Sequence, residues 1–234
     1  MPDAPIPPVA TETIPGTWPG AFGLYKHARQ AMRLNIGTYM AVFLLSLVVG
    51  AIPNTVNQKS PAYFLLNIAS NIVAVWFGAA IIIIVLRSVK GHKISVNDSL
   101  QQGIALFGKY FLQSLLMGLI AIGSILCLIV PAFFILPRLA LAQYYLFDQN
   151  MGIVESIKAS WEATRGHVGK VWGIFGVNFG IVLLMLTIIG IPIAFYFLIM
   201  YTAADAILYF WLVKHGKDTS VTAQVPSAPV SPIK

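Results

Sequence analysis

The sequence predicts an all-α, polytopic membrane protein, and its composition and hydropathy carry that prediction. Of the 234 residues, 58% are hydrophobic and only 10% are charged, whereas a soluble domain has about 25% charged residues. The mean hydropathy is +0.80. Too little polar surface remains to cover a water-soluble globule, so the soluble and disordered classes are excluded.

Six apolar segments are each close to the 20 or so residues that a helix needs to cross a bilayer. They cover residues 35–52, 62–86, 110–130, 131–147, 171–190 and 192–213. The segment 131–147 is short, and it contains Pro137, Arg138 and Gln143. We expect about six transmembrane helices, arranged as three hairpins.

Two polar ends flank these segments. Residues 1–20 are rich in proline and lack the basic start and apolar stretch of a signal peptide. Residues 215–234 are polar and show no periodicity. We therefore expect flexible tails over 1–20 and 215–234, on either side of a membrane domain over 21–214.

The distribution of basic residues supports an even number of crossings. With the amino terminus in the cytoplasm, every lysine and arginine except Lys59 and Arg138 falls on the cytoplasmic side of this topology. Such a bias follows the positive-inside rule. It predicts six spans with both termini in the cytoplasm.

Each hairpin is preceded by a stretch that is predicted to form an amphipathic helix at the interface. These stretches cover residues 21–34, 95–107 and 153–164. In the first, the apolar face is expected to carry Phe22, Tyr25, Ala28 and Met32, and the polar face Lys26, Arg29, Gln30 and Arg33.

A shift of 61 positions aligns the last two hairpins without a gap. Gly108-Lys109 falls on Gly169-Lys170, and Pro131 falls on Pro192. Residues 21–86 resemble a third, divergent unit. Because each unit contains two spans, the units are expected to be parallel and related by an axis along the membrane normal. The alternative is a chance likeness between apolar hairpins.

Two ionisable residues fall inside expected spans, where a charge costs several kcal/mol and marks a candidate functional site. Arg138 is expected about 10 Å below the outer turn and Asp205 about 20 Å below it, at about 1.5 Å per residue. The functional interpretation is a buried pair that lines a polar path or a headgroup site. The favoured alternative is that Arg138 reaches the outer interface and Asp205 bonds neighbouring helices.

Asn67 and Asn71 share one face of the second expected span and are a further candidate polar site. Hydrogen bonding between helices is the more frequent role of such residues.

The expected partners are membrane lipids, in particular anionic headgroups on the cytoplasmic side. Nucleic acid is not expected, because no soluble module with a basic face is present. The candidate headgroup contacts are Lys26, Arg29, Arg33, Lys109, Arg165 and Lys170.

No catalytic motif is visible in the sequence. The metalloprotease, nucleophile-elbow and phosphate-loop patterns do not occur, and the four histidines are not spaced as metal ligands with carboxylates. We therefore expect a non-enzymatic protein without a cofactor, acting as a scaffold or accessory factor. The alternative is a small transporter or exporter with Arg138 and Asp205 in its path.

The sequence also resembles a known group. The stretches "FGLYKHARQAMRLNIGTYM" and "LPRLALAQYYLFDQNMGIVESIKASWEATRGHVGKVWG" are similar to the membrane domain attached to some glycerophosphodiester phosphodiesterases, and to its stand-alone relatives. The resemblance spans residues 18–214 and implies a six-helix bacterial inner-membrane protein with no established activity. The matching positions of the second stretch are Pro137, Arg138, Asp148, Ser160, Thr164 and Gly166. No soluble phosphodiesterase domain follows residue 214, so phosphodiester hydrolysis is not implied.

Overall fold

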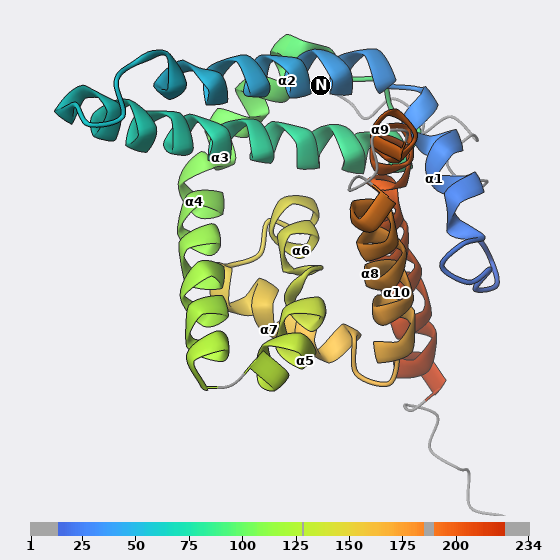
Figure 1. Cartoon of the computed structure of the whole chain (residues 1–234). Helices are drawn as coiled ribbons and strands as arrows, with labels where there is room; N and C mark the ends of the chain where they lie inside the picture. The colour runs from blue at the N-terminus through green and yellow to red at the C-terminus, as the bar shows by residue number, and fades with distance from the viewer. Residues whose placement is uncertain (1–13, 128, 185–189, 223–234) are drawn as a thin grey trace, which may run out of the picture.

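The computed structural model describes residues 14–127, 129–184 and 190–222, and every regular element in these ranges is a helix (Figure 1). The helices are α1 (Leu24–Arg33), α2 (Ile36–Ala51), the short 3-10 turn η2 (Ile52–Thr55), α3 (Pro61–Val89), α4 (Val96–Cys127), α5 (Ile129–Leu139), α6 (Ala142–Asp148), α7 (Ile153–Ala163), α8 (Val168–Leu184), α9 (Gly190–Tyr201) and α10 (Ala203–Thr222). The expected all-α class is confirmed.

Local sequence signals set several helix boundaries. At the start of α3, the Ser60 hydroxyl accepts a hydrogen bond from the Tyr63 N–H at 3.3 Å, and Pro61 occupies the first turn. Gly91, with a φ of 76°, takes the left-handed conformation that ends this helix. The Ser95 hydroxyl then caps α4 by accepting from the Asp98 N–H at 3.1 Å.

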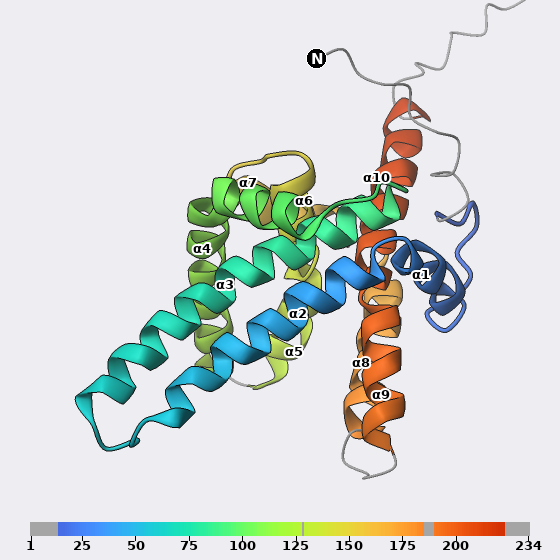
Figure 2. The ribbon, with the colours of Figure 1, turned by 90° about the horizontal axis from the view of Figure 1, so that it is seen from above.

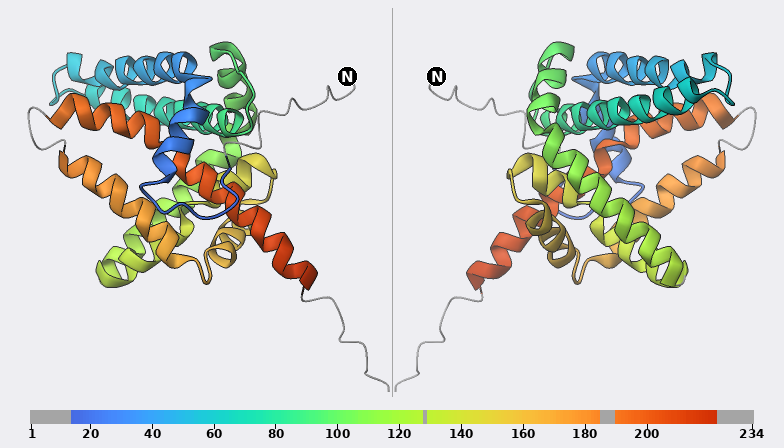
Figure 3. Two further views of the ribbon diagram at one scale, coloured as in Figure 1. Left: turned by 90° about the vertical axis from the view of Figure 1, so that its right-hand side faces the viewer. Right: turned by 90° about the vertical axis from the view of Figure 1, so that its left-hand side faces the viewer.

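Three helical hairpins form the body of the molecule: α2 with α3, α4 with α5, and α8 with α9. In Figure 2 the far ends of all three point toward the lower edge, whereas α6, α7 and the end of α10 lie toward the upper edge. Figure 3 shows the same separation from both sides. The hairpin ends are thus on one face of the molecule, and the connections between hairpins are on the other.

Several helices are long and apolar enough to cross a membrane. Among the described residues these are Ile36–Thr55, Pro61–Val89, Val96–Ser124 and Pro192–His215. A fifth crossing is possible if α7 and α8, which meet at 102°, count as one broken span. The protein is therefore a polytopic membrane protein with four or five candidate spans in the described residues.

Three expected elements differ from the structure. Residues 131–147 are not one helix, because α5 ends at Leu139 and α6 begins at Ala142. The expected interfacial helix over 95–107 is the first part of α4 and is continuous with the span over 110–130, although α4 is bent along its length (Figures 1 and 3). The span expected over 171–190 is described as α8 up to Leu184. This helix alone is too short to be a candidate span, and it becomes one only together with α7.

Helix α1 is amphipathic, but its apolar face was predicted imperfectly. Ala28 and Met32 are buried against α3, α9 and α10, as expected for that face. Leu24 is buried too, whereas Phe22 precedes the helix and is 84% exposed. Residues three or four positions apart share a face only within a helix. Phe22 lies before α1 begins, so helical spacing does not place it on the buried face.

Parts of the two expected tails lie within the described residues. Residues 1–13 and 223–234 lie outside the described residues. Trp18, however, packs edge-on against Trp211 with ring centroids 5.7 Å apart, and Pro15 is buried. At the other end, α10 continues to Thr222.

The 61-residue repeat is visible in the helix boundaries. Helix α5 begins at Ile129 and α9 at Gly190, and α6 begins at Ala142 and α10 at Ala203. Both starting points are separated by 61 positions. The second and third units therefore share a returning arm that is interrupted at the same place.

The three units close into a ring. The returning arm of each unit packs against the helix that begins the next: α3 against α4, α6 against α7, and α10 against α1. A side chain bonds a backbone carbonyl at each junction. The bonds are Trp76 Nε1 of α3 to Leu100 O of α4 at 3.1 Å, Ser160 Oγ of α7 to Arg138 O of α5 at 2.6 Å, and Tyr201 OH of α9 to Ala21 O just before α1 at 2.8 Å. The unit over residues 21–86, which the sequence only suggested, is thus one of the three members of the ring.

A buried asparagine fixes the first unit to the loop after α3. Asn35 is 3% exposed; its Nδ2 donates to Ser88 Oγ at 2.9 Å and to the His92 carbonyl at 2.8 Å. Its Oδ1 accepts from the Ile94 N–H at 3.0 Å. The amide therefore satisfies backbone groups that would otherwise be buried without partners.

Candidate functional site

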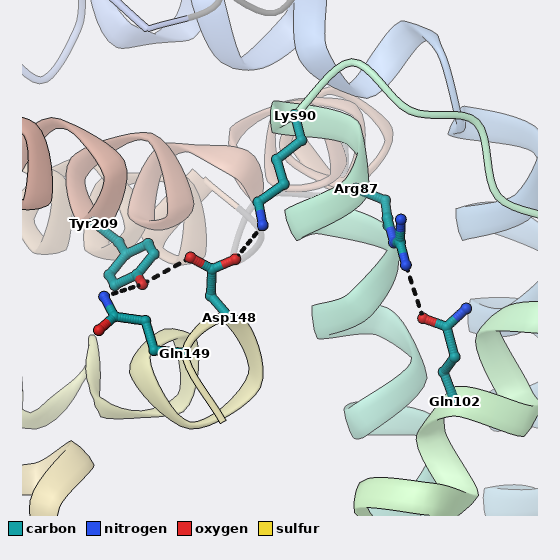
Figure 4. A network of polar contacts seen from close by, with 6 residues as sticks. All are labelled: Arg87, Lys90, Gln102, Asp148, Gln149 and Tyr209. Atoms are coloured by element: carbon teal, nitrogen blue, oxygen red, sulfur yellow. Dashed lines mark hydrogen bonds and ion pairs between the residues drawn. The ribbon is translucent and has the colours of Figure 1, made fainter. Parts of the chain in front are cut away.

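A polar network lies where the returning arms α3, α6 and α10 meet (Figure 4). Lys90 at the end of α3 forms an ion pair with Asp148 at the end of α6. The Tyr209 hydroxyl of α10 donates to Asp148 Oδ2 at 2.9 Å and accepts from Gln149 Nε2 at 2.9 Å. One carboxylate thus joins all three units.

Two members of this network, and an arginine that lines the cavity beside it, follow the repeat. Arg87, Asp148 and Tyr209 are spaced by 61 residues each time. Sequence reasoning missed the set, because the three side chains differ in type and fall at span ends. Extending the 61-residue register into the first unit would have found them. The network therefore lies near the axis that relates the units.

A cavity of about 250 Å³ opens beside the network, between α3, α4 and α6. Its charged lining consists of Arg87, Lys90 and Asp148, so cations outnumber anions. Arg87 Nη2 lies 3.5 Å from Gln102 Oε1, a long contact that leaves most of its donors free. A guanidinium and an ammonium beside one another suit a phosphate group.

The expected headgroup cations of α1 lie on its open face. Lys26 and Arg33 are exposed and Arg29 is half-buried. Arg165, in the turn between α7 and α8, is also exposed. Within the described ranges the structure contains a single ion pair, Lys90 with Asp148, so these four cations have no carboxylate partner there.

Lys109 and Lys170 are engaged differently. Lys109 Nζ donates to Asn150 Oδ1 at 2.7 Å. Lys170 Nζ lies 3.6 Å from the Trp211 ring centroid and 5.5 Å from that of Trp18. An ammonium held between two indole rings is stabilised by their negative faces. Lys170 therefore serves the packing of α8 on α10 and the amino-terminal segment.

His167 lies in the turn beside this ammonium. Burial lowers the pKa of its imidazole, and the positive charge of Lys170 acts in the same direction. The ring contacts Trp211 edge-on at 5.7 Å. His167 is thus held in an environment that favours its neutral form.

Arg138 and Asp205 do not form a pair. The Arg138 guanidinium lies 4.7 Å from the ring centroid of Trp161 on α7, and its Nε is buried without a hydrogen-bond partner among the described residues. The buried pair of the functional interpretation is therefore not formed. Instead, Arg138 contacts the next unit through a cation–π interaction.

Asp205 lines a second cavity, of about 360 Å³, between α4, α5, α6 and α10. The other lining residues are Tyr110, Gln113, Ser114, Met117, Leu136, Leu139, Ala140 and Gln143. Sequence reasoning missed Gln113, which is only 2% exposed. A single glutamine in an apolar helix carries no signal beyond its polarity.

Asn67 and Asn71 bond each other within α3. Asn71 Nδ2 donates to the Asn67 carbonyl at 2.7 Å and to its Oδ1 at 3.0 Å. The pair lies on the part of α3 nearer the hairpin turn. These bonds are within one helix, so the expected bonding between helices is not seen here.

No group of three histidine, cysteine, aspartate or glutamate side chains arranged to hold a metal ion is found in the described part of the chain. Comparison with known proteins gives no match: no family model, no curated protein and no solved structure is similar to this chain. The candidate sites therefore stand on their own geometry.

Proposed function

We propose that this chain is a non-enzymatic scaffold or accessory protein of the bacterial inner membrane, which binds anionic lipid headgroups on its cytoplasmic face. Both termini lie in the cytoplasm in this proposal. The three hairpins anchor the chain in the bilayer. The helices and turns between them present the cations.

One observation carries the proposal: the exposed basic side chains of α1 and of the turn between α7 and α8 lack carboxylate partners among the described residues. Lys26, Arg33 and Arg165 are exposed, and the described residues contain one ion pair in all. A surface lysine or arginine near an anionic membrane contributes about 1 kcal/mol to lipid binding. Several such residues together would hold a shell of anionic lipids.

The cavity beside Arg87 and Lys90 adds a site of defined shape. It places two cations against apolar Ile83 and Leu86. A phosphate with attached acyl chains has the same division between a charged group and an apolar body. This site would hold one headgroup at the ring of returning arms.

Native mass spectrometry tests the proposal. Purified protein is released from detergent after incubation with equal amounts of phosphatidylglycerol and phosphatidylcholine, and the bound lipids are counted. We expect preferential retention of phosphatidylglycerol, and a reduced preference in the triple variant Lys26→Gln, Arg29→Gln, Arg33→Gln. The matched control is Lys59→Gln, on the hairpin turn, which should leave the preference unchanged. Equal retention of both lipids by the unmodified protein would refute the proposal.

A second candidate function is a small transporter, and the cavity at Asp205 favours it. Transporters hold their substrates in polar cavities near the middle of the membrane. Arg138, expected in the same path, does not line this cavity. Reconstituted vesicles would test this function. Uptake of a solute that Asp205→Asn abolishes would support a transporter. If no cationic or anionic solute is taken up, the transporter is excluded and the scaffold proposal is the one that stands.

A further inference from the structure

The cavity at Asp205 contains two hydrogen-bond acceptors that have no partner. Asp205 forms no hydrogen bond or ion pair with any described residue. Gln113 Oε1 is buried and also has none, although the Gln113 side chain is 2% exposed. A buried acceptor without a donor destabilises the folded state, and a carboxylate does so more strongly than an amide. Their pairing in one cavity indicates a missing donor.

The orientation of the Gln113 amide is fixed by its neighbour. The Ser156 hydroxyl donates to the Ile153 carbonyl at 2.7 Å. Its oxygen can then only accept from Gln113 at 3.0 Å, so the Gln113 amide nitrogen must face Ser156. Gln113 Oε1 is therefore the acceptor atom that lacks a partner, on a residue that lines the cavity.

The remaining lining decides what kind of donor fits. None of the described lining residues carries a positive charge, while Met117, Leu136 and Leu139 form an apolar wall. The volume of about 360 Å³ far exceeds the roughly 30 Å³ that one water occupies in the liquid. A bare ion would leave this wall without contacts. A short alkyl chain would fill it.

We propose that this cavity binds a small organic monocation: a primary ammonium group on a short apolar chain. The ammonium donates to the Asp205 carboxylate and to Gln113 Oε1, and neutralises the carboxylate inside the membrane domain. The alkyl chain packs against Met117 and Leu139. This site does not depend on the lipid-headgroup proposal, which concerns other residues on another part of the molecule.

The experiment uses the full chain in nanodiscs with n-hexylammonium as the probe, and 1-hexanol and hexanoate as comparators. Binding is followed by saturation-transfer NMR and by the melting temperature. We expect hexylammonium to bind and raise the melting temperature, with hexanol and hexanoate binding roughly tenfold or more weakly, as the loss of a charge-assisted bond implies. Each probe also partitions into lipid to its own extent, so its signal from empty nanodiscs is subtracted; equal remaining signals for the three probes overturn the proposal.

Two variants locate the site. Asp205→Asn is nearly isosteric and should weaken hexylammonium binding roughly tenfold or more, whereas the matched control Glu162→Gln, on the exposed face of α7, should not. Met117→Trp fills the cavity from α4 and should abolish binding without removing the carboxylate. This second variant decides the question if Asp205→Asn does not fold. Unchanged binding in Met117→Trp, or in folded Asp205→Asn, would overturn the proposal.

Discussion

At the scale of single residues, buried polar groups define this molecule more sharply than its apolar ones. Apolar side chains face both the core and the expected lipid, so their position says little about function. Removing a polar group from water costs free energy unless it finds a partner. Four residues are in such positions: Asn35, Gln113, Asp148 and Asp205. Asn35 and Asp148 are partnered on the protein, Gln113 is partnered only through its amide nitrogen, and Asp205 has no partner among the described residues.

Replacing Asn35 with alanine should destabilise the protein. The change leaves the buried Ile94 N–H and the His92 carbonyl without partners, which we expect to cost at least about 2 kcal/mol. The melting temperature in detergent measures the loss. Asn54→Ala, at an exposed position of the hairpin turn, is the matched control and should change it little. Equal melting temperatures for both variants would mean that the Asn35 bonds contribute nothing.

The environment of His167 predicts a pH dependence of stability. Its pKa in the folded chain is lowered from 6.5, chiefly by burial. Below pH 6.5 the unfolded chain therefore binds a proton at this histidine that the folded chain does not yet bind. The free energy of unfolding consequently decreases as the pH is lowered from 6.5 to the pKa of the folded chain. The stabilising contribution is complete only above pH 6.5. Between pH 8 and pH 5 the melting temperature should fall less for His167→Gln than for the unmodified protein. An identical fall would mean that His167 does not cause the pH dependence.

At the scale of helices, the sequence predicted what hydropathy and periodicity control. The hairpins near 35–86 and the strongly apolar arm over 192–213 were found because long apolar runs bounded by Pro53, Arg87 and Lys214 admit one interpretation. The arm over 131–147 was not, because a run with Pro137 and Arg138 does not reveal where one helix stops and another begins. Bends share this difficulty: the angle of 102° between α7 and α8 depends on packing that hydropathy does not record.

The contact between α3 and α4 predicts a difference between two glycines of one helix. A Cβ atom at Gly103 would lie 3.3 Å from Trp76 Nε1 and 3.4 Å from the Ala80 nitrogen, whereas a Cβ at Gly108 would meet nothing within 4 Å. Gly103→Leu should therefore force the helices apart and cost about 1–3 kcal/mol. Gly108→Leu should be neutral or stabilising, since glycine is a poor helix former. Melting temperatures that rank the variants the other way would contradict this packing.

At the scale of the whole molecule, the three units close into a ring whose centre is polar. The candidate site was predicted from the sequence only in part. Asp205 and the α1 cations were named, but their surroundings were not, because the partners of a side chain depend on how the units pack. Asp148 and Tyr209 show the remedy: these two residues lie one repeat apart and bond each other even though their chemistry differs.

The central claim is that the hairpin ends face one side of the membrane and the connecting helices the other. Labelling by a membrane-impermeant maleimide tests it most directly, on a background in which the single cysteine is replaced by Cys127→Ser. In intact spheroplasts, Asn57→Cys on the hairpin turn should be labelled at once, and Lys214→Cys near the end of α10 only after the membrane is opened. Labelling of both positions from the same side would contradict the account.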